Sequence, residues 1–354
     1  MTPVPPHSPS IRATLERTLK AIWFSHSAWA RIASWLLIPF GWIVAYASTS
    51  RRKRIEALRP PHPPVIVVGN LVVGGSGKTP LAIALARELA ARGLRPGLVC
   101  AGYRGQRTDA RLIEAGANAA EHGDEAVLLA QAHAGPVAAG RDRAAALSKL
   151  LESHPDLDVV ISDDGLQHLG LARTIEIAVF DQRGAGNGRL LPAGPLREPL
   201  RHLATMDAVA LNDGASAPAL APRSFGFRLM PKRFVPLDRS RGEIAADHFA
   251  DWAAGRKITA IAGIGAPERF FSTLASLGLS TENLALDDHA PIDAAWLERI
   301  PGDIVVMTSK DAVKCTGISE SGAQSRYWVL EVDARTDPAF IDWIFEALRG
   351  SSPA

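Results

Sequence analysis

A run of six residues, Gly74-Gly75-Ser76-Gly77-Lys78-Thr79, combines residue types that together can hold a chain of phosphates. Glycines let backbone N–H groups turn inward around phosphate oxygens, and a following helix adds the partial positive charge of its N-terminus. In such a loop Lys78 reaches the β- and γ-phosphates and the Thr79 hydroxyl binds Mg²⁺. The run departs from the strict GxxxxGKS/T spacing, because the first glycine would fall at Val72. A tight strand-to-helix turn without a ligand is the alternative.

The segments on either side favour the phosphate-binding interpretation. An apolar run at 65–69 predicts a buried strand, and residues 81–91 follow a helical pattern. The order of strand, glycine-rich turn, Lys-Thr and helix is the context that such a loop requires. The sequence therefore predicts a nucleotide-binding site at residues 74–79.

Two carboxylates, Asp163 and Asp164, end a second apolar run at 157–162. In phosphate-loop enzymes an acidic residue at this place holds the Mg²⁺ shell opposite the hydroxyl of the loop. A helix cap or a turn is the other common use of aspartate here. The sequence favours the metal role and leaves open which of the two carboxylates contacts the ion.

Four further polar residues allow a structural or a chemical role. Asp124 starts a predicted helix, where aspartate is usually a cap. His168 ends the stretch Asp164-Gly165-Leu166-Gln167-His168 and could orient the metal shell or a substrate, although a lone histidine is more often a surface or core residue. Arg197 and Glu198 lie in a rigid loop at 191–199, where the pair either faces a phosphate and a metal or braces the loop.

The C-terminal part carries three weaker patterns. Asp287-Asp288-His289 follows a predicted strand and could supply a proton-transfer pair, although a polar loop is the simpler interpretation. Thr308-Ser309-Lys310-Asp311 ends another strand, where a cation could enter an interdomain cleft. Gly263-Ile264-Gly265-Ala266-Pro267-Glu268 imitates a dinucleotide fingerprint without its third glycine, which favours a strand-to-helix turn.

The first fifty residues differ from the rest. Residues 1–10 are rich in proline and serine, which predicts disorder. Residues 35–46 carry no charge, are interrupted by Pro39 and Gly41, and lie in a stretch with four of the eight tryptophans. This run is shorter than the roughly 20 residues that a spanning helix needs, and the basic cluster 51–54 follows it. We expect a helical segment in the headgroup zone of a membrane, with a helix pair docked on the protein core, or a full span, as alternatives.

From residue 65 onward, strand and helix patterns alternate at α/β spacing. The expected strands are 65–69, 96–101, 157–162, 175–180, 207–211, 257–262, 283–286, 303–308 and 326–332. The expected helices are 79–91, 123–133, 141–153, 267–278, 292–299 and 338–349. Such alternation predicts a phosphate-loop NTPase-like parallel sheet with ligands at the carboxyl ends of its strands.

A stretch rich in alanine, proline and serine at 213–224 predicts a linker, followed by two extended segments near 225–230 and 233–238. The predicted organisation is a membrane-associating helical segment (1–60), a nucleotide-binding domain (61–222) and a smaller α/β domain that closes the cleft (223–354).

Composition narrows the function classes. The chain has 354 residues, of which 47% are hydrophobic, so it can form two domains with real cores. A net charge of +2 gives no global field for nucleic acid, and no nucleic-acid partner is predicted. Only Cys100 and Cys315 occur, far apart in sequence, which fits buried thiols in a reducing compartment rather than a metal cluster.

Taken together, these motifs resemble the tetraacyldisaccharide 4′-kinase family of lipid A synthesis in Gram-negative bacteria, from about residue 12 to about residue 345. The matching segments include GGSGKTP at 74–80, DDGLQH at 163–168, LPAGPLRE at 191–198 and SKDAVK at 309–314. The resemblance implies transfer of the ATP γ-phosphate, with Mg²⁺, to the 4′-hydroxyl of a tetraacylated glucosamine disaccharide 1-phosphate, which yields lipid IVA. It also implies work at the cytoplasmic face of the inner membrane, where the acylated acceptor lies, without an obligate protein partner.

The resemblance also assigns roles to single residues. It implies that Asp124, paired with His289, accepts the proton of the 4′-hydroxyl, and that Lys78 and Thr79 hold phosphates and Mg²⁺. Asp163 or Asp164, with Glu198, would serve the metal, and Asn70, His168 and Arg197 would meet the substrate. These roles agree with the physical demands of phosphoryl transfer, which needs positioning and charge neutralisation more than covalent chemistry.

Two other function classes remain compatible with a phosphate loop. One is a GTPase-like switch or an ATP-dependent chaperone that acts on a protein partner, and the other is a membrane-associated binding module with vestigial hydrolysis. Asn212-Asp213-Gly214 occupies a strand end where a guanine reader could lie, but it lacks the Lys and the second Asp of that motif. A switch would hydrolyse nucleotide without modifying a lipid.

Overall fold

The computed structural model describes residues 11–25, 27–56, 62–102, 105–168, 170–238, 242–287, 290, 292–315 and 326–350. Its strands are β1 (Val65–Gly69), β2 (Pro96–Cys100), β3 (Arg111–Leu112), β4 (Val137–Ala139), β5 (Val159–Asp163), β6 (Ile175–Phe180), β7 (Ala208–Asn212), β8 (Ser224–Pro236), β9 (Ile244–Ala245), β10 (Ile258–Ala262), β11 (Thr281–Ala285), β12 (Ile304–Thr308) and β13 (Tyr327–Thr336). Its helices are α1 (Ile11–Phe24), α2 (Ala28–Glu56), α3 (Lys78–Ala91), α4 (Ala119–His122), α5 (Asp124–Ala132), α6 (Arg143–Ser153), α7 (Phe249–Trp252), α8 (Pro267–Ser276), α9 (Ala294–Glu298), α10 (Ser309–Ala312) and α11 (Pro338–Gly350), with short 3₁₀ helices η1 (Leu200–Thr205) and η2 (Ala246–His248).

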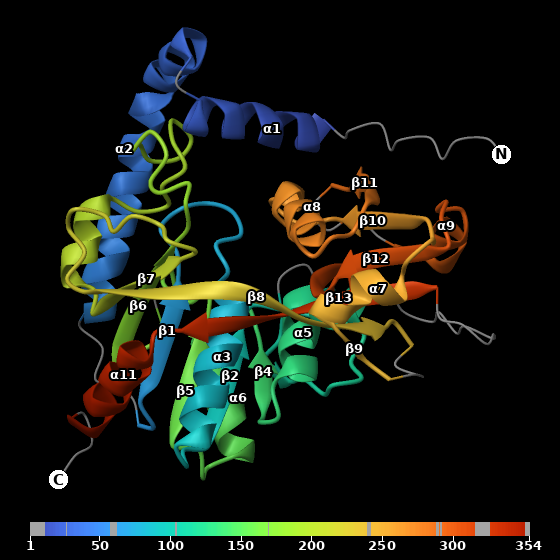
Figure 1. The fold of residues 1–354 in the computed structure, drawn as a ribbon. Helices are drawn as coiled ribbons and strands as arrows, with labels where there is room; N and C mark the ends of the chain where they lie inside the picture. The colour runs from blue at the N-terminus through green and yellow to red at the C-terminus, as the bar shows by residue number, and fades with distance from the viewer. Residues whose placement is uncertain are drawn as a thin grey trace.

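Within the described ranges, thirteen strands form one mixed sheet in the order β11-β10-β12-β13-β8-β7-β6-β1-β5-β2-β4-β3, with β9 paired to β8. Figure 1 shows this sheet running through two lobes, with helices on its faces and α2 along one side. The predicted α/β class is confirmed. The short strands β3, β4 and β9, the short helices α4, α7 and α10 and the two 3₁₀ helices had not been predicted.

The N-terminal lobe is a parallel sheet with β3 as an antiparallel edge strand, and β1 lies between β5 and β6. These three central strands are buried along their whole length, so both faces of the sheet must be covered there. One face packs against α3, α5 and α11, and the other packs against α6 and η1. The carboxyl ends of β1 and β5 therefore lie side by side, which brings the segments after residues 69 and 163 to one edge.

The two lobes are joined by β8 and β13, which form a long antiparallel ribbon. The first part of β8 pairs in parallel with β7, so the sheet continues across the predicted boundary at residue 222. The two predicted segments near 225–230 and 233–238 are one strand, in which Pro231 lies opposite Val332 beside a bulge. The predicted linker 213–224 is the connection that leads from β7 into this strand.

The strands β9 to β12 and the helices α7 to α10 form the smaller C-terminal lobe, in which β10, β11 and β12 are parallel. Helix α11 had been expected in this second domain. It instead packs on the core of the N-terminal lobe, with Phe340 and Ile344 buried beside α3. Cys100 and Cys315 are free thiols, the first buried and the second partly buried.

The N-terminal helices are held against the N-terminal lobe but keep an exposed apolar surface. Ile22 and Trp23 of α1 are buried, and the Trp23 indole donates to Pro192 O at 2.9 Å. By contrast, the side chains of Trp35 and Trp42 on α2 are 65% and 70% exposed. Some apolar side chains of this segment therefore pack on the protein, and others face outward.

Helix α2 differs from the expectation in two respects. It runs unbroken through Pro39 for 29 residues, so the predicted interruption is wrong. Its part Ala28–Lys53 is long and apolar enough to cross a membrane by length and composition, with 17% of the apolar window buried. Arg52 of the basic cluster is buried, and its guanidinium donates to Glu176 Oε1 at 3.1 Å, so it anchors α2 to β6 instead of facing lipid.

Candidate active site

The predicted phosphate loop lies between β1 and α3, at the carboxyl edge of the sheet. Helix α3 begins at Lys78 and is preceded by Gly77, whose φ of 91° is the left-handed conformation that favours glycine. A Cβ on Gly77 would lie 2.8 Å from Asn212 Nδ2, a second reason for glycine here. The free N–H groups of the first turn of α3 therefore open toward the site.

Two buried asparagines fix the loop from outside. Asn70 Nδ2 donates to Gly74 O at 3.0 Å, and Asn212 Nδ2 donates to Ser76 O at 3.0 Å. In a trans peptide the carbonyl and the next amide point in opposite directions, so these bonds turn the following N–H groups the other way. Asn70 had been predicted to meet the substrate. Its side chain is fully buried under the loop, a position that suits holding the loop.

Asp163 lies beside the loop hydroxyl, as a metal-shell carboxylate should. Thr79 Oγ1 donates to Asp163 Oδ2 at 2.6 Å. Burial and the neighbouring charge of Glu125 raise the pKa of Asp163 to about 7. No donor within the described residues reaches the buried Asp163 Oδ1. A buried carboxylate with an open oxygen beside the loop hydroxyl fits a divalent ion at this point.

Asp164 has a different environment. It takes a positive φ of 51°, which turns its carboxylate toward the cations of the site. Lys78 Nζ lies 3.7 Å from Asp164 Oδ1, and Arg197 Nη1 lies 3.3 Å from it. Burial alone would raise the pKa of Asp164, but Lys78 and Arg197 outweigh it and lower that pKa. Asp164 is thus an ionised partner for two cations that could also bind phosphate.

The loop at 191–199 is braced by a hydrogen-bond network. Arg197 Nη1 donates to Gln167 Oε1 at 3.2 Å, and Gln167 Nε2 donates to Glu198 Oε1 at 2.9 Å. His202 Nδ1 lies 3.1 Å from Glu198 Oε2. Although burial would raise the pKa of Glu198, the bonds from His202 and Gln167 lower it. Both oxygens of Glu198 already have partners, so its geometry suits bracing more than metal ligation.

Asp124 is buried at the first position of α5, after Gly123 with a φ of 89°. Helix α5 leads into β4, which is parallel to β2 and β5, so α5 starts at the edge of the sheet where the phosphate loop lies. Its neighbour Glu125 raises the pKa of Asp163, in agreement with a position of this helix end near the loop. His289, the predicted partner of Asp124, lies outside the described residues, as does Asp288.

Arg143 lies next to Asp163, and its charge acts on His168. Burial and the positive charge of Arg143 lower the pKa of His168 to about 4, so its imidazole is neutral at physiological pH. Arg143 is buried, donates to Gly140 O at 2.9 Å and lies 3.5 Å from Asp163 O. No motif had identified Arg143. Its only signal in the sequence was its place near the start of the helix predicted at 141–153, which is α6 with Asp142 as its cap.

The pattern 308–311 has a structural use. Asp311 is fully buried, accepts from Thr308 Oγ1 at 2.7 Å and from Gly263 N at 3.0 Å, and lies 2.7 Å from Lys314 Nζ. These bonds fasten the turn at 263–268 to β12. That turn connects β10 to α8, so the predicted strand-to-helix turn is confirmed.

Comparisons with known proteins agree with this geometry. A family model described as tetraacyldisaccharide-1-P 4′-kinase matches residues 33–349. The tetraacyldisaccharide 4′-kinase of Dechloromonas aromatica is 46% identical over 344 residues, which cover 96% of this chain and 100% of the relative. That of Bordetella petrii is 42% identical over 346 residues, covering 94% and 95%. The crystal structure of LpxK from Aquifex aeolicus in complex with ATP has a TM-score of 0.72 at 26% identity, covering 89% of this chain and 99% of that one.

Proposed function

Because this chain belongs to the tetraacyldisaccharide-1-P 4′-kinase family, we propose that it transfers the γ-phosphate of ATP to the 4′-hydroxyl of a tetraacylated glucosamine disaccharide 1-phosphate, forming lipid IVA. The observation that carries this function is the family match over residues 33–349, which contains an assembled phosphate loop with Lys78 and Thr79 beside Asp163 and Asp164. The loop alone would fit any phosphate-loop NTPase, whereas the family match specifies the acceptor.

ATP would lie with its phosphates on the N–H groups of the loop and the start of α3. Lys78 would exchange Asp164 for the phosphates: its Nζ lies 3.7 Å from Asp164 Oδ1, and the two side chains are only 13% and 29% exposed. Thr79 and Asp163 would hold Mg²⁺, and the open Asp163 Oδ1 supports this. When bound, the ion neutralises charge on the phosphate oxygens. Within the described residues no cluster of three His, Cys, Asp or Glu forms a metal site, so phosphate and water would supply most ligands.

Asp164 and Glu198, the other predicted metal ligands, would act mainly by positioning. Asp164 holds Lys78 and Arg197 at the site, and Glu198 holds Gln167, which in turn accepts from Arg197. Arg197 would then present its remaining N–H groups to the transferring phosphate or to the acceptor. A guanidinium that is fixed before substrate binds loses little entropy when the phosphate arrives.

Asp124 would accept the proton of the 4′-hydroxyl, with His289 as its partner. Its place at the N-terminus of α5, on the carboxyl edge of the sheet, supports this role. Positioned general bases contribute about 10²–10⁴-fold to such reactions. His168, neutral and half-buried beside Arg143, would meet the sugar as a hydrogen-bonding group.

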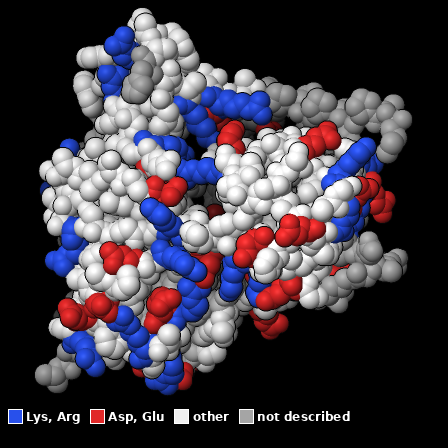
Figure 2. Space-filling model, in the orientation of Figure 1, with Lys and Arg blue, Asp and Glu red and all other residues white. Residues whose placement is uncertain are grey.

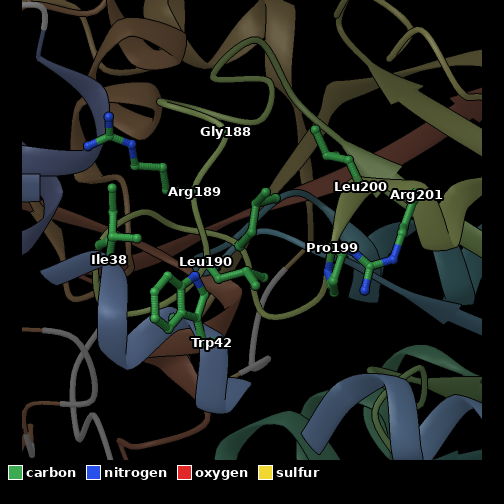
Figure 3. Close-up of a pocket in the computed structure, with 11 residues that line it drawn as sticks. Ile38, Trp42, Gly188, Arg189, Leu190, Pro199, Leu200 and Arg201 are labelled. Carbon is green, nitrogen blue, oxygen red and sulfur yellow. The ribbon is translucent and has the colours of Figure 1, made fainter. Parts of the chain in front are cut away.

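The acceptor carries acyl chains, so the enzyme would work at a membrane surface. Large apolar side chains along α2 are exposed, among them Ile32, Trp35, Leu36, Phe40, Trp42, Ile43 and Tyr46. A contiguous exposed apolar face of this kind marks a membrane or protein contact. Beside it, a hollow of about 330 Å³ lies between α2 and the segment 188–201, with Ile38, Trp42 and Leu190 in its wall and Arg189 and Arg201 at its sides (Figure 3). Apolar walls flanked by arginines suit the boundary between acyl chains and phosphate headgroups.

We place the enzyme at the cytoplasmic face of the inner membrane, with α2 as its lipid contact and the cleft at headgroup depth. Figure 2, in the orientation of Figure 1, shows Lys and Arg side chains along the boundary between the two lobes on the face toward the viewer. Such a charge distribution would attract a phosphorylated acceptor and anionic lipid together.

The decisive experiment incubates the purified protein with γ-labelled ATP, Mg²⁺ and the disaccharide 1-phosphate lipid in mixed micelles. The expected result is label in a bisphosphorylated glycolipid. Release of labelled inorganic phosphate without labelled lipid would instead indicate a nucleotide switch or a chaperone. A Lys78→Met variant controls for contaminating kinases and should lose the transfer.

A further inference from the structure

Arg183, which lies shortly after β6, contacts the phosphate loop from outside. Its Nη2 donates to Gly75 O at 2.9 Å. A Cβ on Gly74, which has a φ of 107°, would lie 2.8 Å from Arg183 Nη1, so the guanidinium occupies the space that a side chain there would need. Neither the motifs of the sequence nor the proposed catalytic steps use this arginine.

With Arg183, three successive loop carbonyls each accept a bond from a side chain. Asn70 binds Gly74 O, Arg183 binds Gly75 O and Asn212 binds Ser76 O. Carbonyls held on the outer side leave the N–H groups of residues 75, 76 and 77 facing the phosphate side. Two of the three donors are neutral and buried, whereas the third is a charged, partly exposed group whose position depends on other elements.

Asp181 sets the position of Arg183. It is 4% exposed, and its carboxylate accepts from Arg183 Nε at 3.0 Å and from Nη2 at 2.7 Å. The same carboxylate lies 3.2 Å from Nη1 of Arg269, which belongs to α8 of the C-terminal lobe. The Arg183 guanidinium also lies 5.6 Å from the ring of Phe24 at the end of α1. Three separate elements therefore determine where this side chain points.

The C-terminal lobe approaches the loop at the same glycine. A Cβ on Gly265 would lie 3.6 Å from Gly75 N, so the 263–268 turn is in close range of the loop backbone. That turn is rigid, because Asp311 and Lys314 bind Gly263. Because Gly265 and Arg269 belong to the same lobe, we expect the approach of the turn to Gly75 and the contact of Arg269 with Asp181 to occur in the same arrangement of the two lobes.

We propose that Arg183 is a positioning residue for the ATP triphosphate, held in place by Asp181 and by Arg269 of the C-terminal lobe. It fixes the Gly75 carbonyl outward, and the seating of the C-terminal lobe against the loop completes its support. The loop would consequently be fully ordered for phosphate only when the two lobes are together. This inference rests on the proposed function only in taking ATP as the nucleotide.

The test compares Arg183→Met, Arg183→Lys and Arg269→Met, with Arg95→Met as a matched control whose arginine pairs with Asp156 and Asp158 instead of contacting the loop. Losing a charge-assisted bond should weaken binding of a non-hydrolysable ATP analogue, measured without lipid, by about tenfold or more in Arg183→Met. Arg183→Lys should recover part of this loss, because an ammonium can donate to one carbonyl but cannot also hold Asp181 in a fork. KM for the lipid should stay within about twofold.

Arg269 is 42% exposed and is expected to tolerate substitution. Its variant therefore still tests the proposal if Arg183→Met fails to fold. Arg269→Met should weaken analogue binding several-fold, and the double variant should be no weaker than Arg183→Met alone. Unchanged analogue affinity in both single variants, or losses that simply add, would overturn the proposal. If the wild-type protein binds the analogue in an Arg183-dependent way but never labels the lipid, the proposed function fails and this inference stands.

Discussion

The ammonium group of Lys20, on α1, donates a hydrogen bond to the carbonyl of Gly265 in the C-terminal lobe at 2.9 Å. Figure 1 shows α1 extending from α2 across to this lobe. Arg17, one turn earlier, lies 3.9 Å from Asp287 on the same lobe. Helix α1 therefore connects α2 to the lobe that approaches the phosphate loop.

Lys20→Met should loosen this connection. The loss of one charged hydrogen bond in a partly exposed place is expected to lower kcat/KM for the lipid about fivefold, with little change in melting temperature. The assay is phosphate transfer in mixed micelles. Lys149→Met is the matched control, because that lysine is exposed on α6 and pairs with Glu152 one turn later. Equal rates for wild type and Lys20→Met would show that the connection has no part in turnover.

Asp124→Asn should lower kcat by at least about 100-fold while leaving ATP-analogue affinity within about threefold, because the amide cannot accept the hydroxyl proton. Asp142→Asn provides a structural comparison, since Asp142 caps α6 through bonds to the N–H groups of Ala144 and Ala145. If the two variants lose stability to a similar degree, and if kcat falls in neither by more than the loss of folded protein explains, Asp124 is a structural residue.

The local elements of this chain could be predicted from its sequence because their patterns are local. The apolar run at 65–69 is β1 to the residue, and the glycine-rich turn with Lys78 begins α3 as expected. The partners that hold this turn could not be found in the same way. Asn212 is 136 positions away from Ser76, and Arg183 is 108 positions away from Gly75. Only the order of strands around β1 brings them together.

The placement of chain ends was equally non-local. Helix α11 has a clear amphipathic pattern, but the pattern does not say which apolar surface it covers, and it packs on the first lobe. In the sequence, Arg52 is one of the four basic residues at 51–54. In the structure it is buried in an ion pair with Glu176. The paired acidic residue lies on β6, so no signal within the N-terminal segment could separate Arg52 from Arg51.

Asp163→Asn and Asp164→Asn should separate the two carboxylates. Asp163 lies beside Thr79, so its amide variant should raise the Mg²⁺ concentration needed for half-maximal activity by at least about tenfold. Asp164 binds Lys78 and Arg197, so its variant should mainly raise KM for ATP. A Mg²⁺ titration at saturating ATP measures the difference. If Asp164→Asn instead raised the Mg²⁺ requirement and Asp163→Asn mainly raised KM for ATP, the metal would be assigned to Asp164.

The exposed face of α2 should carry lipid binding. The double variant Ile32→Glu/Ile43→Glu, at side chains 64% and 68% exposed, should lower the partition onto anionic phospholipid vesicles at least about tenfold, because each apolar side chain contributes about 1.5–3 kcal/mol when buried. Leu220→Glu, at a side chain 47% exposed in the connection between β7 and β8, is the control. Sedimentation with vesicles gives the partition. Undiminished binding of the double variant would move the lipid contact to another surface.

Folding stability should fall as the pH drops from about 6.5 to 4, in part because of His168. Burial and Arg143 lower its pKa from the ordinary 6.5 to about 4, so over this interval the unfolded chain binds a proton that the folded protein does not. The whole shift corresponds to about 3 kcal/mol, and partial exposure reduces the expected loss to about 1–2 kcal/mol. Above pH 6.5 both states are neutral at this position and the contribution is constant.

His168→Gln should therefore make the free energy of unfolding less dependent on pH within this interval, as measured by urea denaturation at several pH values. His154→Gln, at the end of α6, is the matched control for removing one imidazole. Since the glutamine stays uncharged, the variant should gain on the wild type as the pH falls, whatever its stability at neutral pH. Parallel curves for wild type and His168→Gln would mean that His168 takes up its proton as readily in the folded protein as in the unfolded chain.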